Sequence, residues 1–178
     1  MVELREHMEF SVYEALRRAG EPFPYVWDGT LEPQEYAGHA VVFSGDAHVE
    51  GTFVFDGKAF TVTGEAVVSY QAVCARCCEP FCETLRFSFS ERFVRAVLRT
   101  DEDDEAYPYE GERIVLDKAF YDNLFLALPP VSVCKPDCKG LCPVCGTNLN
   151  QTTCNCRNES CDGPFGALQQ LLNENKEV

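Results

Sequence analysis

Cysteine is the residue type in this sequence whose number and spacing most clearly predict a chemistry. The chain has 178 residues and 11 cysteines, which gather in two stretches, Cys74 to Cys82 and Cys134 to Cys161. So many cysteines in a short chain indicate either disulfides in a secreted protein or metal ligands in a reducing compartment. The charges near the start of the chain argue against both a signal peptide and a membrane anchor. We therefore expect metal ligands in a cytoplasmic protein.

Eight of the cysteines form four closely spaced pairs. The pairs are Cys74 and Cys77, Cys134 and Cys138, Cys142 and Cys145, and Cys154 and Cys156. Two such pairs supply the four thiolates of a tetrahedral Zn²⁺ site, because each tight turn presents both of its sulfurs to one ion. Gly146, directly after one pair, suits the left-handed turn that leads the chain away from a metal. The spacing predicts one or two structural zinc ions.

The sequence favours one combination of these pairs but leaves others open. We expect a first site of Cys74, Cys77, Cys134 and Cys138, and a second site of Cys142, Cys145, Cys154 and Cys156. The alternative is a single site that joins Cys74 and Cys77 to Cys142 and Cys145. Cys161 is a further candidate ligand in place of Cys154 or Cys156, since ligation by both members of a C-x-C pair strains the backbone between them. Cys78 and Cys82 are expected to be small buried residues.

The predicted ligand sets argue against catalysis. Four protein ligands leave no open position on zinc for water or substrate. The three histidines, His7, His39 and His48, lie far from the cysteine pairs in sequence. A redox C-x-x-C would need a βαβ setting that the sequence lacks. We expect a protein that is not an enzyme.

Alternating side chains predict the β-strands that carry these cysteines. Residues 39–99 read as consecutive antiparallel strands, in which the even-numbered positions from Phe60 to Ala72 are mostly apolar and the odd-numbered positions mostly polar. Gly64 interrupts that alternation and is expected to mark a bulge. Asp56 and Gly57 predict a hairpin turn just before it.

The remaining segments predict a few helices and loops around this β body. We expect a short strand and helix before Gly20, an irregular packed segment over 22–38, and an acidic mobile loop near 101–112. A strand over 114–116 and a helix near 117–128, with Asp117 as its N-cap, should follow. The sequence thus predicts an α+β fold: a mainly antiparallel body, barrel- or sandwich-like, over 1–130, and a zinc-knuckle segment with a C-terminal helix over 131–178.

The formal net charge of −14 limits the class of partner. A strongly acidic protein repels a phosphate backbone, so the charge does not favour direct contact with RNA. Such contact would need a local patch, for which the arginines at 86, 92, 95 and 99 are the candidates. A basic protein is the better expectation.

Three blocks of sequence resemble a known family. They are residues 73–81 (Val-Cys-Ala-Arg-Cys-Cys-Glu-Pro-Phe), 126–131 (Leu-Ala-Leu-Pro-Pro-Val) and 134–150, which includes Cys-Lys-Gly-Leu-Cys-Pro-Val-Cys-Gly. In order and spacing they are similar to the YceD family, the large ribosomal RNA subunit accumulation proteins. The resemblance implies a role in ribosome assembly without known enzymatic activity. The sequence departs from the family pattern at Cys78, where leucine is usual, and at residues 162–164.

The leading hypothesis is a non-catalytic assembly factor that binds a basic ribosomal protein or a pre-ribosomal particle. Two alternatives come from other classes. One is a zinc-dependent transcription or protein-interaction adaptor that uses a knuckle as its docking surface. The other is a thiol oxidoreductase or metal store.

Overall fold

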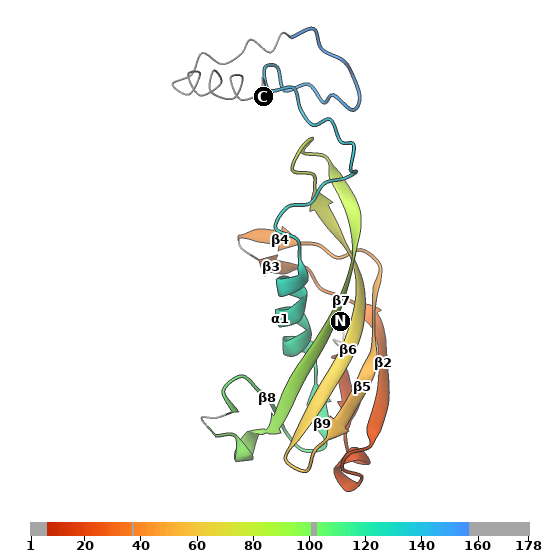
Figure 1. Ribbon diagram of the computed structural model, residues 1–178, viewed down its shortest axis with the longest axis vertical. Coiled ribbons are helices and arrows are strands. Elements are labelled where there is room, and N and C mark those ends of the chain that lie inside the picture. Colours follow the sequence, from red (N-terminus) through yellow and green to blue (C-terminus); the bar gives the residue numbers. More distant parts are fainter. Residues whose placement is uncertain (1–6, 37, 101–102, 157–178) are drawn as a thin grey trace, which may run out of the picture. The chain divides into compact units, whose positions relative to one another are not determined.

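The computed structural model describes residues 7–36, 38–100 and 103–156 of the chain (Figure 1). These residues divide into two compact units. The first unit contains the described residues up to 74 together with 79–134, and the second contains 75–78 together with the described residues from 135 onward. Within this described part, no helix has the length and apolar character needed to cross a membrane.

A five-stranded sheet forms the body of the first unit. Its order is β2 (Pro22–Thr30), β5 (Asp46–Phe55), β6 (Ala59–Val73), β7 (Pro80–Arg95) and β8 (Tyr107–Tyr109). The first four strands pair antiparallel, and β8 pairs parallel to β7. Because β2 and β8 are its two edges, the sheet is open rather than closed into a barrel.

Two small sheets and one α-helix complete the described part of this unit. The elements are β1 (Glu9–Ser11) paired with β9 (Arg113–Val115), β3 (Gln34–Tyr36) paired with β4 (His39–Val41), two short 3₁₀ turns (Ala15–Arg17 and Ala96–Leu98) and α1 (Asp117–Ala127). Helix α1 packs against β7. The predicted fold class, mainly antiparallel β with a minor helical part, is confirmed.

The predicted alternation and hairpin are both present. On β6 the even positions from Phe60 to Ala72 are buried and the odd positions are more exposed. In the β5–β6 turn, the Asp56 carboxylate accepts hydrogen bonds from the amides of Lys58 and Ala59, each at 2.7 Å. Gly57 has a φ of 97°, which a residue with a side chain rarely adopts.

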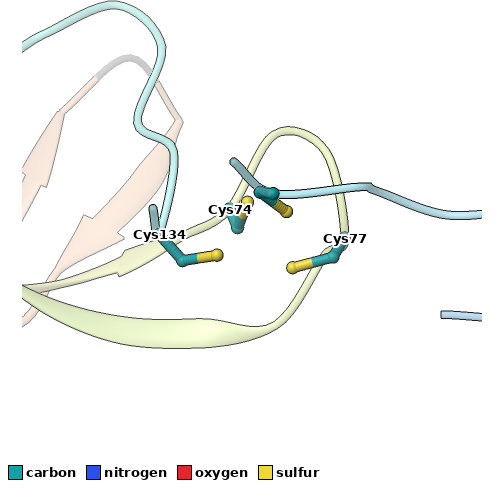
Figure 2. Close-up of side chains that lie close together, drawn as sticks. Cys74, Cys77 and Cys134 are labelled. Carbon is teal, nitrogen blue, oxygen red and sulfur yellow. The ribbon is translucent and has the colours of Figure 1, made fainter. Parts of the chain in front are cut away.

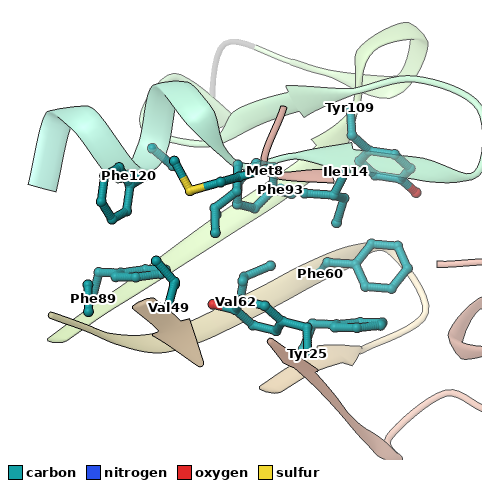
Figure 3. Close-up of a cluster of buried hydrophobic side chains, with 14 of the residues drawn as sticks. Met8, Tyr25, Val49, Phe60, Val62, Phe89, Phe93, Tyr109, Ile114 and Phe120 are labelled. Atoms are coloured by element: carbon teal, nitrogen blue, oxygen red, sulfur yellow. The ribbon is translucent and has the colours of Figure 1, made fainter. Parts of the chain in front are cut away.

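The core lies between one face of the large sheet and the layer made by β1, β9 and α1 (Figure 3). The sheet contributes apolar side chains such as Val49, Phe60 and Phe93, and the covering layer contributes Ile114 and Phe120, all at most 1% exposed. Phe60 and Tyr109 meet edge to face, with their ring centroids 5.4 Å apart. The first unit therefore has a core of its own.

The prediction of a bulge at Gly64 is wrong. Gly64 pairs with Gly51 on one side and Phe89 on the other, in ladders whose register is unbroken. The glycine is instead required by packing, because a Cβ there would lie 2.4 Å from the Tyr25 hydroxyl and 2.5 Å from the Phe89 ring. Gly64 leaves room for two aromatic side chains on the core face.

The segment expected to be irregular, 22–38, contains the edge strand β2 and the short strand β3. Proline interrupts a central strand by removing a ladder hydrogen bond, but an edge strand has one unpaired side. Pro22 and Pro24 therefore fit in β2. Phe23, Tyr25 and Trp27 alternate with them and turn their rings toward the core.

The acidic segment is more ordered than expected. Tyr107–Tyr109 forms β8 instead of part of a mobile loop, and Tyr109 is buried. Asp103 is also buried and accepts hydrogen bonds from the amide and hydroxyl of Thr100. These contacts hold part of the acidic segment in place, which its composition alone did not predict.

Two further expectations concern helix ends. Asp117 begins α1 but makes no capping hydrogen bond, because its carboxylate accepts one from the amide of Met8 and contacts the His7 ring. The expected N-cap is therefore wrong. The expected C-terminal helix lies outside the described residues.

Candidate metal centre

Four cysteines that are distant in sequence form the first cysteine group. It consists of Cys74, Cys77, Cys134 and Cys138, whose sulfurs all lie within 4.8 Å of one another. Cys74 and Cys77 occupy the turn that joins β6 to β7, and Figure 2 shows their side chains close to that of Cys134. A zinc–sulfur distance of about 2.3 Å places the sulfurs of a tetrahedral site about 3.8 Å apart, so this donor set fits zinc.

The turn that carries Cys74 and Cys77 is closed by its own backbone. The amide of Cys74 donates to the carbonyl of Glu79 at 3.0 Å. Cys78 has a φ of 58°, the left-handed conformation that Gly146, with φ 71°, adopts after the Cys142–Cys145 pair. Each C-x-x-C turn thus ends in the same backbone conformation, once with glycine and once with a residue for which that conformation is costly.

Arg76 is a functional candidate that the sequence reasoning missed. Its guanidinium donates to the carbonyls of Pro136 at 3.3 Å and Cys138 at 3.1 Å. Its own carbonyl accepts a hydrogen bond from the amide of Leu141 at 3.0 Å. Gly140, with φ 73°, lies so close that a Cβ would be 2.9 Å from the same carbonyl. Arg76 therefore holds the 75–78 turn against residues 136–141, and only its place inside a C-x-x-C pair could have indicated this.

The second cysteine group is formed within a single short stretch. It consists of Cys142, Cys145, Cys154 and Cys156, again with all sulfurs within 4.8 Å of one another. The amide of Cys142 donates to Thr147 at 2.8 Å, and the amide of Gly146 donates to Cys142 at 2.9 Å. A β-bridge between Leu141 and Asn148 closes the knuckle. Both members of the C-x-C pair take part in the group.

Hydrogen bonds within the second cysteine group separate the acidities of its thiols. The Thr147 hydroxyl, 3.1 Å from the sulfur of Cys145, helps lower the pKa of Cys145 to about 6. The hydrogen bond with Cys145 raises the pKa of Cys156 to about 12. Because a thiol must lose its proton to ligate zinc, binding of zinc to this group would release protons.

The two groups differ in their access to solvent. Three members of the first cysteine group are buried, and Cys74 is fully buried. In the second cysteine group only Cys142 is buried, and Cys145 and Cys156 are exposed. An ion in the first group would be shielded from water and competing ligands, whereas one in the second group would be reached more easily.

The sulfurs are grouped as the favoured pairing expects, and not as a single site from the two C-x-x-C turns. That either group binds a metal stays a prediction. Cys161, the alternative ligand, lies outside the described residues.

The expected burial of Cys78 and Cys82 is wrong, because both are exposed. Cys78 lies in the turn after Cys77, and Cys82 pairs with Gln71 on the solvent face of the sheet. Two of the histidines lie next to carboxylates instead of thiols: His7 is 2.8 Å from Asp117 and His48 is 2.6 Å from Asp28.

Comparison with known proteins places these features in one family. The model of the YceD family, described as large ribosomal RNA subunit accumulation protein YceD, matches residues 62–172. This range contains every member of both cysteine groups. No solved structure matches the chain.

Relatives come from bacteria and plants. An uncharacterized protein of Mycobacterium tuberculosis is 34% identical over 114 residues, which cover 62% of this chain and 55% of that protein. An Arabidopsis thaliana protein named large ribosomal RNA subunit accumulation protein YCED homolog 1, chloroplastic, is 34% identical over 76 residues, 41% of this chain and 24% of its own. Its Zea mays counterpart is 38% identical over 58 residues, 32% and 20% of the two chains. The chain therefore spans about half the length of the mycobacterial relative and less of the plant ones.

Proposed function

Because the chain belongs to the YceD family, we propose that it supports the accumulation of large-subunit ribosomal RNA as a non-catalytic, zinc-binding assembly factor. The observation that carries this proposal is the family match over residues 62–172. The names of the plant relatives, which state the same role, support it. The two cysteine groups support the zinc-binding part, because thiolates in sets of four are the donors that structural zinc prefers.

Zinc would act here as a cross-link. It supplies no reactive position when four thiolates surround it, and its free energy of binding is spent on ordering the loops that carry the ligands. In this chain those loops are the 74–79 turn and the segment from Cys134 to Cys156, which hold little regular secondary structure. The protein would thus present fixed loops to a partner instead of turning over a substrate.

A basic ribosomal protein, free or within a pre-ribosomal particle, is the partner that we propose. The formal net charge of −14 favours it, and two bound ions would lower the charge to about −18. The solvent face of the large sheet contributes to this negative charge, since Glu50 lies directly opposite Glu65 on the neighbouring strand. Like charges at paired positions disfavour folding slightly, and a cationic partner would remove that cost. Cysteines that act as metal ligands suit the reducing cytoplasm, where we place the protein.

Depletion of the protein tests the proposal. We expect the ratio of large to small ribosomal RNA to fall, and the wild-type chain to restore it. A Cys74→Ser variant should fail to restore the ratio, because it removes a buried member of the first cysteine group. An unchanged ratio after depletion would contradict the proposal.

Affinity capture at low salt separates the assembly role from the adaptor and thiol roles. Enrichment of ribosomal proteins or large-subunit precursors supports assembly, and enrichment of transcription proteins alone supports an adaptor. Bound zinc that is lost readily, with disulfides that cycle under mild reductants, would instead support an oxidoreductase or metal store.

A further inference from the structure

Asn150 connects the two cysteine groups through its side chain. It lies between Cys145 and Cys154, in the loop that joins the two cysteine pairs of the second cysteine group. Its side-chain amide nitrogen, however, donates to the sulfur of Cys138 in the first cysteine group at 3.3 Å.

The neighbouring hydrogen bonds fix the orientation of this amide. The Asn150 side-chain oxygen accepts a hydrogen bond from the amide of Lys139 at 2.9 Å. A backbone N–H can only donate, so the oxygen must face Lys139 and the NH₂ group must face the sulfur. The second N–H of that group donates to the side-chain oxygen of Asn148 at 3.0 Å. Each polar position of the Asn150 amide is therefore used.

The backbone keeps Asn150 in place through the second cysteine group. The amide of Leu149 donates to the carbonyl of Gly140 at 2.9 Å, and Asn148 forms the bridge with Leu141. Both contacts belong to the knuckle that an ion in the second cysteine group would close. Ordering this knuckle therefore positions the donor that reaches Cys138.

An N–H donor matters more to a metal-bound thiolate than to a free thiol. Four thiolates around one Zn²⁺ carry about −2 net charge, which a nearby donor stabilises. Groups that hydrogen-bond to metal ligands typically change metal affinity about 10- to 100-fold. The bond from Asn150 to Cys138 is thus expected to be stronger when the first cysteine group holds its ion.

We propose that Asn150 is a positioning residue that couples the two zinc sites, so that an ion in either cysteine group strengthens binding in the other. This inference rests on the proposed binding of zinc. The coupling is reciprocal, because the same free energy links both binding events. The full chain would then fill its two sites together.

A binding cycle tests this coupling on the full chain. Zinc affinity of the first cysteine group is measured against a chromophoric competing chelator, once with the second group intact and once with Cys154→Ser and Cys156→Ser. We expect the intact chain to bind about tenfold more tightly. In the Asn150→Ala background the two affinities should become equal. Thr152→Ala, an exposed position in the same loop, is the matched control and should keep the tenfold ratio.

Two further measurements distinguish coupling from a general loss of folding. Asn150→Asp keeps the acceptor for Lys139 but turns an anion toward the thiolate, so it should weaken binding more than alanine does. In cadmium-loaded protein, NMR should detect a scalar coupling between the Asn150 side-chain protons and the metal through the Cys138 sulfur. Two ions that bind independently in the wild type, or a ratio unaffected by Asn150→Ala, would overturn the coupling alone. A wild-type chain that binds no zinc would overturn the proposed zinc binding itself.

Discussion

Cys74 and Cys78 are close neighbours in sequence with opposite surroundings. Cys74 is fully buried, and its sulfur lies within 4.8 Å of the other three of its group. Cys78 is exposed and has a left-handed backbone conformation. The type of residue is the same, so only position decides whether a cysteine is a candidate ligand or a solvent-exposed thiol.

This contrast predicts different zinc contents for two variants. Cys74→Ser should reduce the bound zinc from two ions to one, because oxygen replaces one of four thiolates in a buried site. Cys78→Ser should keep two. Elemental analysis of protein purified under reducing conditions measures both. Equal zinc contents in the two variants would argue against the first cysteine group as a metal site.

At Gly64, the absence of a side chain decides the packing. Gly64→Ala should lower the free energy of unfolding by about 1 to 3 kcal/mol, since the added Cβ would overlap the Tyr25 hydroxyl and the Phe89 ring. Urea denaturation measures the change. Ser88→Ala, on the solvent face of the adjacent strand, serves as the control and should have little effect. If Gly64→Ala leaves the free energy of unfolding unchanged, the two rings can move aside.

Among the elements, β8 illustrates how a strand forms in an acidic stretch. It is three residues long and is held by parallel pairing to β7, while Tyr107 donates to Asp122 of α1 at 2.9 Å. Asp103 precedes it, and hydrogen bonds from Thr100 hold the pKa of the Asp103 carboxyl below its ordinary value. The turn before the strand therefore contains a buried carboxylate whose ionised form these hydrogen bonds favour.

The lowered pKa gives a pH dependence for β8. A carboxyl whose pKa is lower in the folded state stabilises the fold above its ordinary pKa of about 3.9, and this contribution is lost as the pH falls through the folded-state value. Asp103→Asn removes the charge that the hydrogen bonds from Thr100 favour, so it should loosen this turn. The Ala106 amide, which donates to the backbone carbonyl of residue 103, should then exchange faster at neutral pH. Asp104→Asn, at an exposed neighbour, is the control. If both variants exchange alike, the Asp103 carboxylate does not stabilise the turn before β8.

On the scale of the whole molecule, the two units differ in what stabilises them. The first has an apolar core between its large sheet and the covering layer. Among the described residues of the second unit, the buried apolar side chains are all cysteines. The proposed zinc ions would thus matter most to the second unit.

Removal of metal should affect the two units unequally. With a strong chelator, backbone amides in 75–78 and 135–156 should exchange at least about tenfold faster, because loops without a core lose their cross-links. Amides in β5 and β6 should be nearly unchanged. Hydrogen exchange followed by mass spectrometry measures both regions in one sample. Equal acceleration in the large sheet would indicate that the zinc ions stabilise the entire chain.

The sequence by itself determined the features that are encoded over a few residues. Alternation predicted β6, the Asp56–Gly57 pair predicted its hairpin, and the spacing of the cysteine pairs predicted the donor type, because each depends on neighbours along the chain. The tertiary structure alone decided that the main sheet is open, that Gly64 accommodates two rings, and that Arg76 and Asn150 contact the residues around the cysteines. These features join residues far apart in sequence, and their contact energies depend on a fold that no local pattern specifies.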